Sequence, residues 1–118
     1  MTLFRAIPLA IHGVVEVLAA TVLIAAPFLL GFGYEAGAVS IVLGTMLMGL
    51  ALSTHGEHRT VPLTAHAGLD YVIGGIAIVG GLALAIADAP LVATTFLVGF
   101  GAAHMALTAS TRFSIRGA

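Results

Sequence analysis

The chain has 118 residues, of which 60% are hydrophobic and 8% are charged, with a formal net charge of −1. So few charges cannot cover a soluble domain of this size, whereas lipid accommodates apolar side chains on the outside. The near-neutral charge argues against a nucleic-acid partner, and the absence of cysteine excludes disulfides, thiolate metal sites and cysteine nucleophiles. We therefore predict one integral membrane domain over residues 1–118, with the lipid bilayer as its surroundings.

Four apolar segments are long enough to cross the roughly 30 Å hydrocarbon core of a bilayer as helices. The first has the outline of a signal peptide, but His12 and Glu16 would interrupt its apolar region, so we interpret it as a membrane helix. Turn residues separate the segments. In chain order, the predicted helices cover about 7–30, 36–53, 63–87 and 90–110. This pattern predicts an all-α, four-helix transmembrane bundle.

Arginine residues predict the orientation of the bundle. With four spans, both termini and the central loop lie on one side, and the chain's four basic residues all fall there: Arg5, Arg59, Arg112 and Arg116. The two opposite loops carry the acids Glu35 and Asp88 instead. The positive-inside rule then places both termini in the cytoplasm, with the chain in the inner (plasma) membrane.

The sequence indicates an internal duplication with a period of about 54 to 55 residues. His12-Gly-Val-Val-Glu16 aligns with His66-Ala-Gly-Leu-Asp70, and Gly44 aligns with Gly99 after one inserted residue. We predict a first repeat over about 7–54, a cytoplasmic loop over about 55–62 and a second repeat over about 63–111. Each repeat is a helical hairpin, and an even number of spans gives the two repeats a parallel arrangement.

Both repeats begin with a histidine followed by an acid four residues later, but in the second repeat Gly80-Gly81-Leu82 replaces the triplet of the first and no Gly-Phe follows it at the same distance. In the first, His12 and Glu16 precede Ala26-Pro27-Phe28 and Gly31-Phe32; in the second, His66 and Asp70 hold the leading positions. This order resembles the SPW-repeat family of small bacterial membrane proteins, with Phe28 where that family has tryptophan. The resemblance covers about residues 7–112. It implies the four-span architecture and does not imply an activity or a cofactor.

Five ionisable residues lie inside predicted membrane helices, where such groups are costly and suggest a function. A spacing of four places each histidine and its acid on one helical face, and the duplication predicts that the two pairs face each other. The fifth residue, on the last helix, is expected at a similar depth. The five candidate site residues are His12, Glu16, His66, Asp70 and His104.

Three interpretations of these residues stay open. In the first, each acid pairs with its own histidine or with one across the axis, and the pairs hold the helices in register. In the second, the residues bind a transition metal, or His12 and His66 ligate haem. In the third, they move protons, although the non-cytoplasmic halves offer few polar groups beyond Thr21. A second group, His55, Glu57 and His58, reads as a solvated loop.

Small residues predict where helices approach each other closely. Candidates on the last two segments include Gly74-Gly75, Gly80-Gly81, Gly99 and Gly101. No catalytic arrangement or nucleotide-binding loop is evident in the sequence. We therefore expect a non-enzymatic structural or partner-binding membrane component, as a homo-oligomer or in a larger complex. It needs no cofactor in this interpretation, and haem or metal binding is the alternative.

Overall fold

A computed structural model describes residues 5–53 and 61–114. These residues form four helices: α1 (Leu9–Leu30), α2 (Tyr34–Leu52), α3 (Leu63–Ile86) and α4 (Leu91–Ala109). All four are long and apolar enough to cross a membrane. The predicted all-α bundle of membrane-spanning helices is confirmed, with helix ends within two residues of the predicted ones. Arg59, Arg116 and the loop group His55, Glu57 and His58 lie outside the described residues.

Proline and glycine determine where several helices begin and end. A proline directly precedes α1, α3 and α4 (Pro8, Pro62 and Pro90), at the helix start where a missing N–H is tolerated. Helix α1 ends at Leu30 and is capped by Gly31, whose φ of 67° is left-handed and whose N–H bonds to the carbonyl of Pro27. The three-residue link that follows turns the chain back, so that α1 and α2 form a hairpin.

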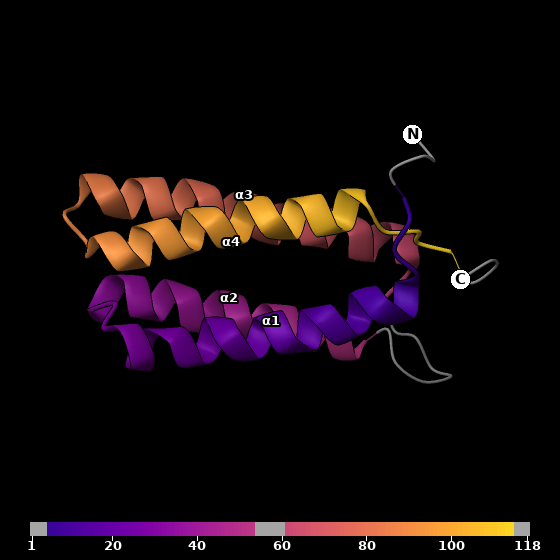
Figure 1. Ribbon diagram of the computed structural model, residues 1–118, viewed down its shortest axis with the longest axis horizontal. Coiled ribbons are helices and arrows are strands. Elements are labelled where there is room, and N and C mark those ends of the chain that lie inside the picture. Colours follow the sequence, from indigo (N-terminus) through magenta and orange to yellow (C-terminus); the bar gives the residue numbers. More distant parts are fainter. Residues whose placement is uncertain (1–4, 54–60, 115–118) are drawn as a thin grey trace.

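The helices pack as two antiparallel hairpins that lie side by side, α1 with α2 and α3 with α4 (Figure 1). The links within the hairpins lie at one end of the bundle, and the start of α1 and the end of α4 lie at the other. Glycines allow close approach inside each hairpin: a Cβ on Gly44 would lie 2.7 Å from Ile24 Cγ1, and one on Gly101 would lie 2.5 Å from the Gly74 carbonyl oxygen. Close approach is confirmed at Gly74, Gly81 and Gly101, whereas Gly75 and Gly99 have nothing within 4 Å.

The two hairpins correspond in structure, with a register that differs from the sequence alignment. Helix α3 begins 54 residues after α1, whereas α4 begins and ends 57 residues after α2. Gly44 packs on Ala20 and Ile24, and Gly101 packs on the residues 54 positions later, Gly74 and Ile78. By its packing, Gly101 holds the place in the second hairpin that Gly44 holds in the first, two residues from the Gly99 that the sequence alignment pairs with Gly44. The cause is that α3 has 24 residues where α1 has 22, and the link after it is one residue longer.

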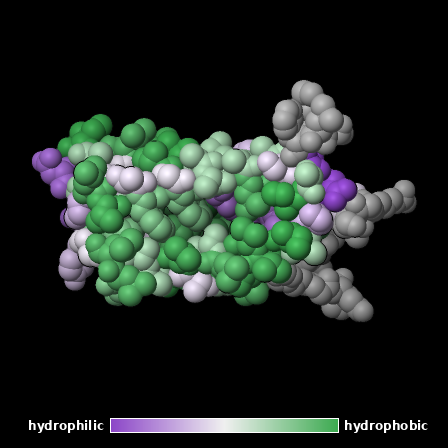
Figure 2. Space-filling model, in the orientation of Figure 1, coloured by the Kyte–Doolittle hydropathy of each residue, from purple (hydrophilic) through white to green (hydrophobic). Residues whose placement is uncertain are grey.

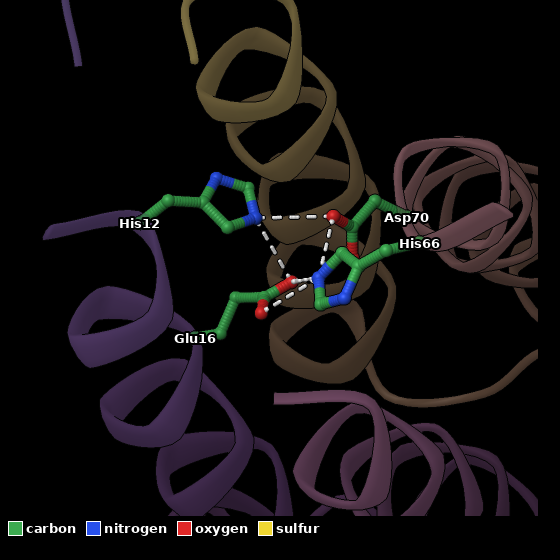
Figure 3. Close-up of side chains that lie close together, drawn as sticks. All are labelled: His12, Glu16, His66 and Asp70. Carbon is green, nitrogen blue, oxygen red and sulfur yellow. Dashed lines mark hydrogen bonds and ion pairs between the residues drawn. The ribbon is translucent and has the colours of Figure 1, made fainter. Parts of the chain in front are cut away.

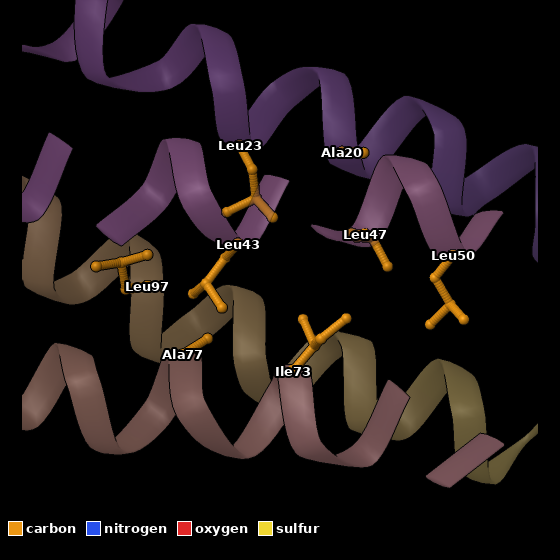
Figure 4. Packing of buried hydrophobic residues seen from close by; sticks show 8 residues of the cluster. All are labelled: Ala20, Leu23, Leu43, Leu47, Leu50, Ile73, Ala77 and Leu97. Atoms are coloured by element: carbon orange, nitrogen blue, oxygen red, sulfur yellow. The ribbon is translucent and has the colours of Figure 1, made fainter. Parts of the chain in front are cut away.

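An apolar core fills the middle of the bundle, with side chains from all four helices (Figure 4). Its buried members are Ala20, Leu23, Leu43, Leu47, Leu50, Ile73, Ala77 and Leu97. A smaller apolar cluster, which includes Phe32, lies toward the hairpin links. Hydrophobic residues also cover most of the outer face in view, and hydrophilic ones gather near the two ends (Figure 2). An apolar exterior between polar ends is what a bilayer requires.

Candidate functional site: a buried histidine–carboxylate cluster

All five predicted site residues meet near the end of the bundle where α1 starts and α4 ends. Helix α1 contributes His12 and Glu16, α3 contributes His66 and Asp70, and α4 contributes His104. Four of them are fully buried, and His104 is 3% exposed. Figure 3 shows His12, Glu16, His66 and Asp70 pointing toward one another from two helices. We call these five residues the histidine–carboxylate cluster.

Short contacts run both within and between helices of the cluster. Within α1, His12 Nε2 lies 3.0 Å from Glu16 Oε1, and within α3, His66 Nε2 lies 3.3 Å from Asp70 Oδ2. These are the contacts that a spacing of four predicts. Across the hairpins, His12 Nε2 lies 3.0 Å from Asp70 Oδ2, and His66 Nε2 lies 3.1 Å from Glu16 Oε2. Both pairings that the sequence leaves open are therefore present together.

Asp70 has one more partner than Glu16. Its Oδ1 lies 3.2 Å from His104 Nε2, while its Oδ2 faces both His12 and His66. The position 57 residues before His104 is Leu47, which lies in the apolar core. The second hairpin thus adds a third imidazole where the first has a leucine. The two carboxylates therefore have different surroundings, with three histidines around Asp70 and two around Glu16.

Thr111 fixes the orientation of His12 from outside the cluster. His12 Nδ1 lies 2.7 Å from Thr111 Oγ1, and that hydroxyl donates its proton to the Leu107 carbonyl at 2.6 Å. Because a threonine hydroxyl has one proton to donate, it accepts from His12, and Nδ1 therefore carries the hydrogen. The Nε2 atom of a neutral His12 then presents its lone pair to Glu16 and Asp70.

A backbone bridge places Thr111 over the cluster. The Ile7 N–H donates to the Ser110 carbonyl at 3.0 Å, and the Arg112 N–H donates to the Ile7 carbonyl at 2.9 Å. The segment before α1 is thereby tied to the segment after α4 in an isolated parallel bridge between Ile7 and Thr111. Sequence reasoning missed the contact between Thr111 and His12, because Thr111 lies past the end of α4, where helical spacing gives no signal.

Two aromatic rings shield the cluster. The Phe113 ring centre lies 5.0 Å from that of His12 and 5.9 Å from that of His66. The Phe100 ring stacks on His104 at 5.6 Å, with 7° between the planes. Sequence analysis did not single out either phenylalanine. Because apolar rings exclude water, charges in the cluster interact in a medium of low dielectric constant.

The buried polar groups of the cluster do not extend through the bundle to the hairpin links. Among the residues that the structure describes, the interior beyond the cluster is the apolar core of leucine, alanine and isoleucine. The buried hydroxyl of Ser40 is bonded to the Leu23 carbonyl, and that of Thr94 to the Leu91 carbonyl. Thr21, the polar residue noted in the sequence, is exposed and bonds to Val17. The described interior therefore offers no continuous chain of polar groups from the cluster to the hairpin links.

The chain is a multi-pass membrane protein with this buried cluster as its distinguishing feature. Comparison with protein-family models, with curated proteins and with solved structures gives no match.

Proposed function

We propose that this chain is a non-enzymatic structural component of the bacterial plasma membrane, in which the histidine–carboxylate cluster holds two helical hairpins together as one unit. The observation that carries the proposal is the direct contact between His12 of the first hairpin and Asp70 of the second, at 3.0 Å and fully buried. The apolar outer face then serves as the surface for lipid, for further copies of the chain or for a larger membrane complex.

The contacts across the hairpins support this role because lipid gives helices little hydrophobic reason to associate. Packing between the hairpins is less extensive than packing within each of them. Polar contacts near one end therefore supply specificity where close packing is limited. A hydrogen bond between membrane helices contributes on average about 0.6 kcal/mol, so several bonds around one carboxylate pair add up to a useful amount.

A double-mutant cycle between His12 and Asp70 tests the proposal. Stability is measured by unfolding the protein with SDS in mixed micelles, for wild type, His12→Leu, Asp70→Asn and the double variant. We expect an interaction free energy of about 0.5 kcal/mol or more between the two sites. Thr45 serves as the control partner for His12, because its hydroxyl bonds only to the Ile41 carbonyl on α2 and is exposed. Additive effects for both pairs would contradict a role in joining the hairpins.

Proton conduction, the third interpretation of the sequence, receives less support. The described interior between the cluster and the hairpin links is apolar, and a relay requires polar groups along the whole path. We expect vesicles that contain the protein to lose a pH gradient no faster than empty vesicles. A leak that Asp70→Asn abolishes would reverse this ranking.

The proposed orientation places both termini in the cytoplasm. Arg5 precedes α1 and Arg112 follows α4, whereas Glu35 lies in the first turn of α2 and Asp88 in the link between α3 and α4. This distribution supports the positive-inside assignment. Partners are sought by purification in mild detergent, where a stable oligomer or a specific co-purifying membrane protein is the expected result.

A further inference from the structure

We propose that the histidine–carboxylate cluster is a binding site for one divalent transition-metal ion. His12, Glu16, His66 and Asp70 are the ligands in this proposal, and His104 is a positioning residue that holds Asp70. Metal binding goes beyond the structural role, because the same contacts could join the hairpins with protons alone.

The four ligand atoms already have the spacing of a small metal site. One atom from each residue can be chosen so that all four lie within 4.8 Å of one another. The nitrogen–oxygen separations across the group are 3.0 to 3.3 Å. Ligands at about 2.0–2.1 Å from a tetrahedral zinc ion are about 3.3 Å apart. An ion at the centre would therefore require the nitrogen–oxygen pairs to move slightly apart and the widest pair, up to 4.8 Å, to move closer together.

The hydrogen-bond pattern requires a proton or a metal ion between the ligands. Because Thr111 receives the Nδ1 hydrogen of His12, the Nε2 lone pair of the neutral ring faces carboxylate oxygens of Glu16 and Asp70 at 3.0 Å. Two acceptors at that distance repel each other unless a proton or a metal ion lies between them. Thr111 thus directs Nε2 of His12 toward the two carboxylates, where either a proton or a metal ion supplies the positive charge between them.

Charge balance favours a doubly charged ion. Glu16 and Asp70 are fully buried carboxylates, and burying unpaired charge in lipid is strongly unfavourable. One divalent ion with neutral imidazoles makes the group electrically neutral in a single step. Two imidazolium ions would also do so, and this all-proton alternative is what the experiment must separate from metal binding.

The donor set indicates which ions fit. Imidazole nitrogen together with carboxylate oxygen suits zinc, iron or manganese better than calcium or magnesium, which prefer oxygen ligands alone. Haem fits less well, because His12 and His66 both touch the carboxylates of Glu16 and Asp70 through Nε2. A porphyrin between the two rings would have to displace those carboxylates.

Outer contacts at His12 and Asp70 resemble those that orient metal ligands in proteins, whereas the Nδ1 atom of His66 is buried without a hydrogen-bond partner. A ligating histidine usually donates its other ring N–H to an oxygen, as His12 does to Thr111. A ligating carboxylate is usually held by a further donor, and His104 Nε2 lies 3.2 Å from Asp70 Oδ1, on the side away from His12 and His66. We therefore place His104 outside the primary ligand set.

The test is metal binding by the full-length protein in detergent, after treatment with a chelator. Zn²⁺ binding is measured by equilibrium dialysis with elemental analysis, and Co²⁺ is added as a spectroscopic probe, because tetrahedral Co²⁺ absorbs visible light far more strongly than octahedral Co²⁺. His55 and His58 could bind metal in the loop. The reference protein therefore carries His55→Ala and His58→Ala, and any affinity tag is removed.

We expect the reference protein to bind one Zn²⁺ per chain and to give the tetrahedral Co²⁺ spectrum. In that background, Glu16→Gln and His66→Gln should each weaken Zn²⁺ binding by more than about 100-fold, since removing an outer contact alone costs 10- to 100-fold. His104→Leu should weaken it by no more than about 100-fold and keep the tetrahedral spectrum. Stoichiometric binding that survives the double change Glu16→Gln/His66→Gln would overturn the proposal.

A second measurement on the reference protein decides the matter if the variants fail to fold. X-ray absorption of the Zn²⁺-loaded protein should show four nitrogen or oxygen ligands with the scattering pattern of two imidazoles. No binding by the reference protein, or a spectrum with six oxygen ligands, would overturn metal binding. The coupling between His12 and Asp70 measured without metal would remain, so this failure is distinct from failure of the structural role.

Discussion

His12 on α1 and Asp70 on α3 share a buried contact of 3.0 Å between Nε2 and Oδ2, although 58 residues separate them in the chain. Each is also within contact distance of the partner four residues away on its own helix, Glu16 and His66 respectively. The two hairpins are therefore joined by a closed set of contacts, in which loss of one side chain leaves the others unbalanced. Charge balance in the cluster, more than any single bond, should decide how substitutions behave.

Removing one carboxylate alone should lower the stability of the protein more than removing a histidine together with its acid. Glu16→Leu leaves three histidines around one carboxylate, whereas His12→Leu/Glu16→Leu removes a histidine with its acid. We expect the single change to lower the free energy of unfolding by about 3 kcal/mol or more, and the double change to cost less. Unfolding by SDS in mixed micelles provides the measurement. A double variant less stable than the single one would show that the side chains matter as individual packing elements.

Thr111 and Thr108 offer a matched pair for testing the outer contacts of the proposed metal site. Both are buried and bond to a carbonyl four residues earlier, but only Thr111 also contacts His12. We expect Thr111→Val to weaken Zn²⁺ binding by about 10- to 100-fold, because the imidazole loses the acceptor that orients it. Thr108→Val should leave the affinity near that of wild type. Equal losses in the two variants would point to general loosening of this end of the bundle.

Much of the fold follows from the sequence because lipid imposes simple requirements. Segment length, hydrophobicity and turn residues predict four spans, and a spacing of four predicts the contact of His12 with Glu16. Contacts between hairpins depend instead on how whole helices pack. The triple contact of Asp70 with His12, His66 and His104 is therefore visible only in the structure.

Two features escape sequence reasoning for specific physical reasons. Thr111 and Phe113 reach the cluster from an irregular segment held by a backbone bridge, which no periodic pattern encodes. The register of the second hairpin shifts because α3 gains two residues and the following link gains one, so alignment by residue type selects Gly99. Matching glycine with glycine is a weak guide to equivalent positions when neighbouring glycines face different surroundings.

Those neighbouring glycines give the third prediction. A Cβ on Gly101 would lie 2.5 Å from the Gly74 carbonyl oxygen and 2.6 Å from Ile78 Cγ1, whereas one on Gly99 meets nothing within 4 Å. Gly101→Ala should therefore push α3 and α4 apart and lower the free energy of unfolding by about 1–3 kcal/mol. Gly99→Ala should be neutral or slightly stabilising in the same SDS assay, because alanine favours the helix. A destabilising Gly99→Ala would instead indicate that this outer face packs against another copy or a partner.

The orientation of the bundle can be measured directly because the chain has no cysteine. Ala6 and Ala87 are exposed residues at opposite ends of the bundle, next to α1 and in the link between α3 and α4 respectively. Neither substitution changes a charge, so Ala6→Cys and Ala87→Cys should leave the positive-inside signal intact. A membrane-impermeant maleimide is added to cells in which it reaches the periplasmic face of an intact inner membrane. Under these conditions we expect Ala87→Cys to be labelled at once. Ala6→Cys should react only after the membrane is permeabilised. The reverse pattern would place the termini outside, and the histidine–carboxylate cluster would then lie near the periplasmic face, where an ion would reach it without entering the cytoplasm.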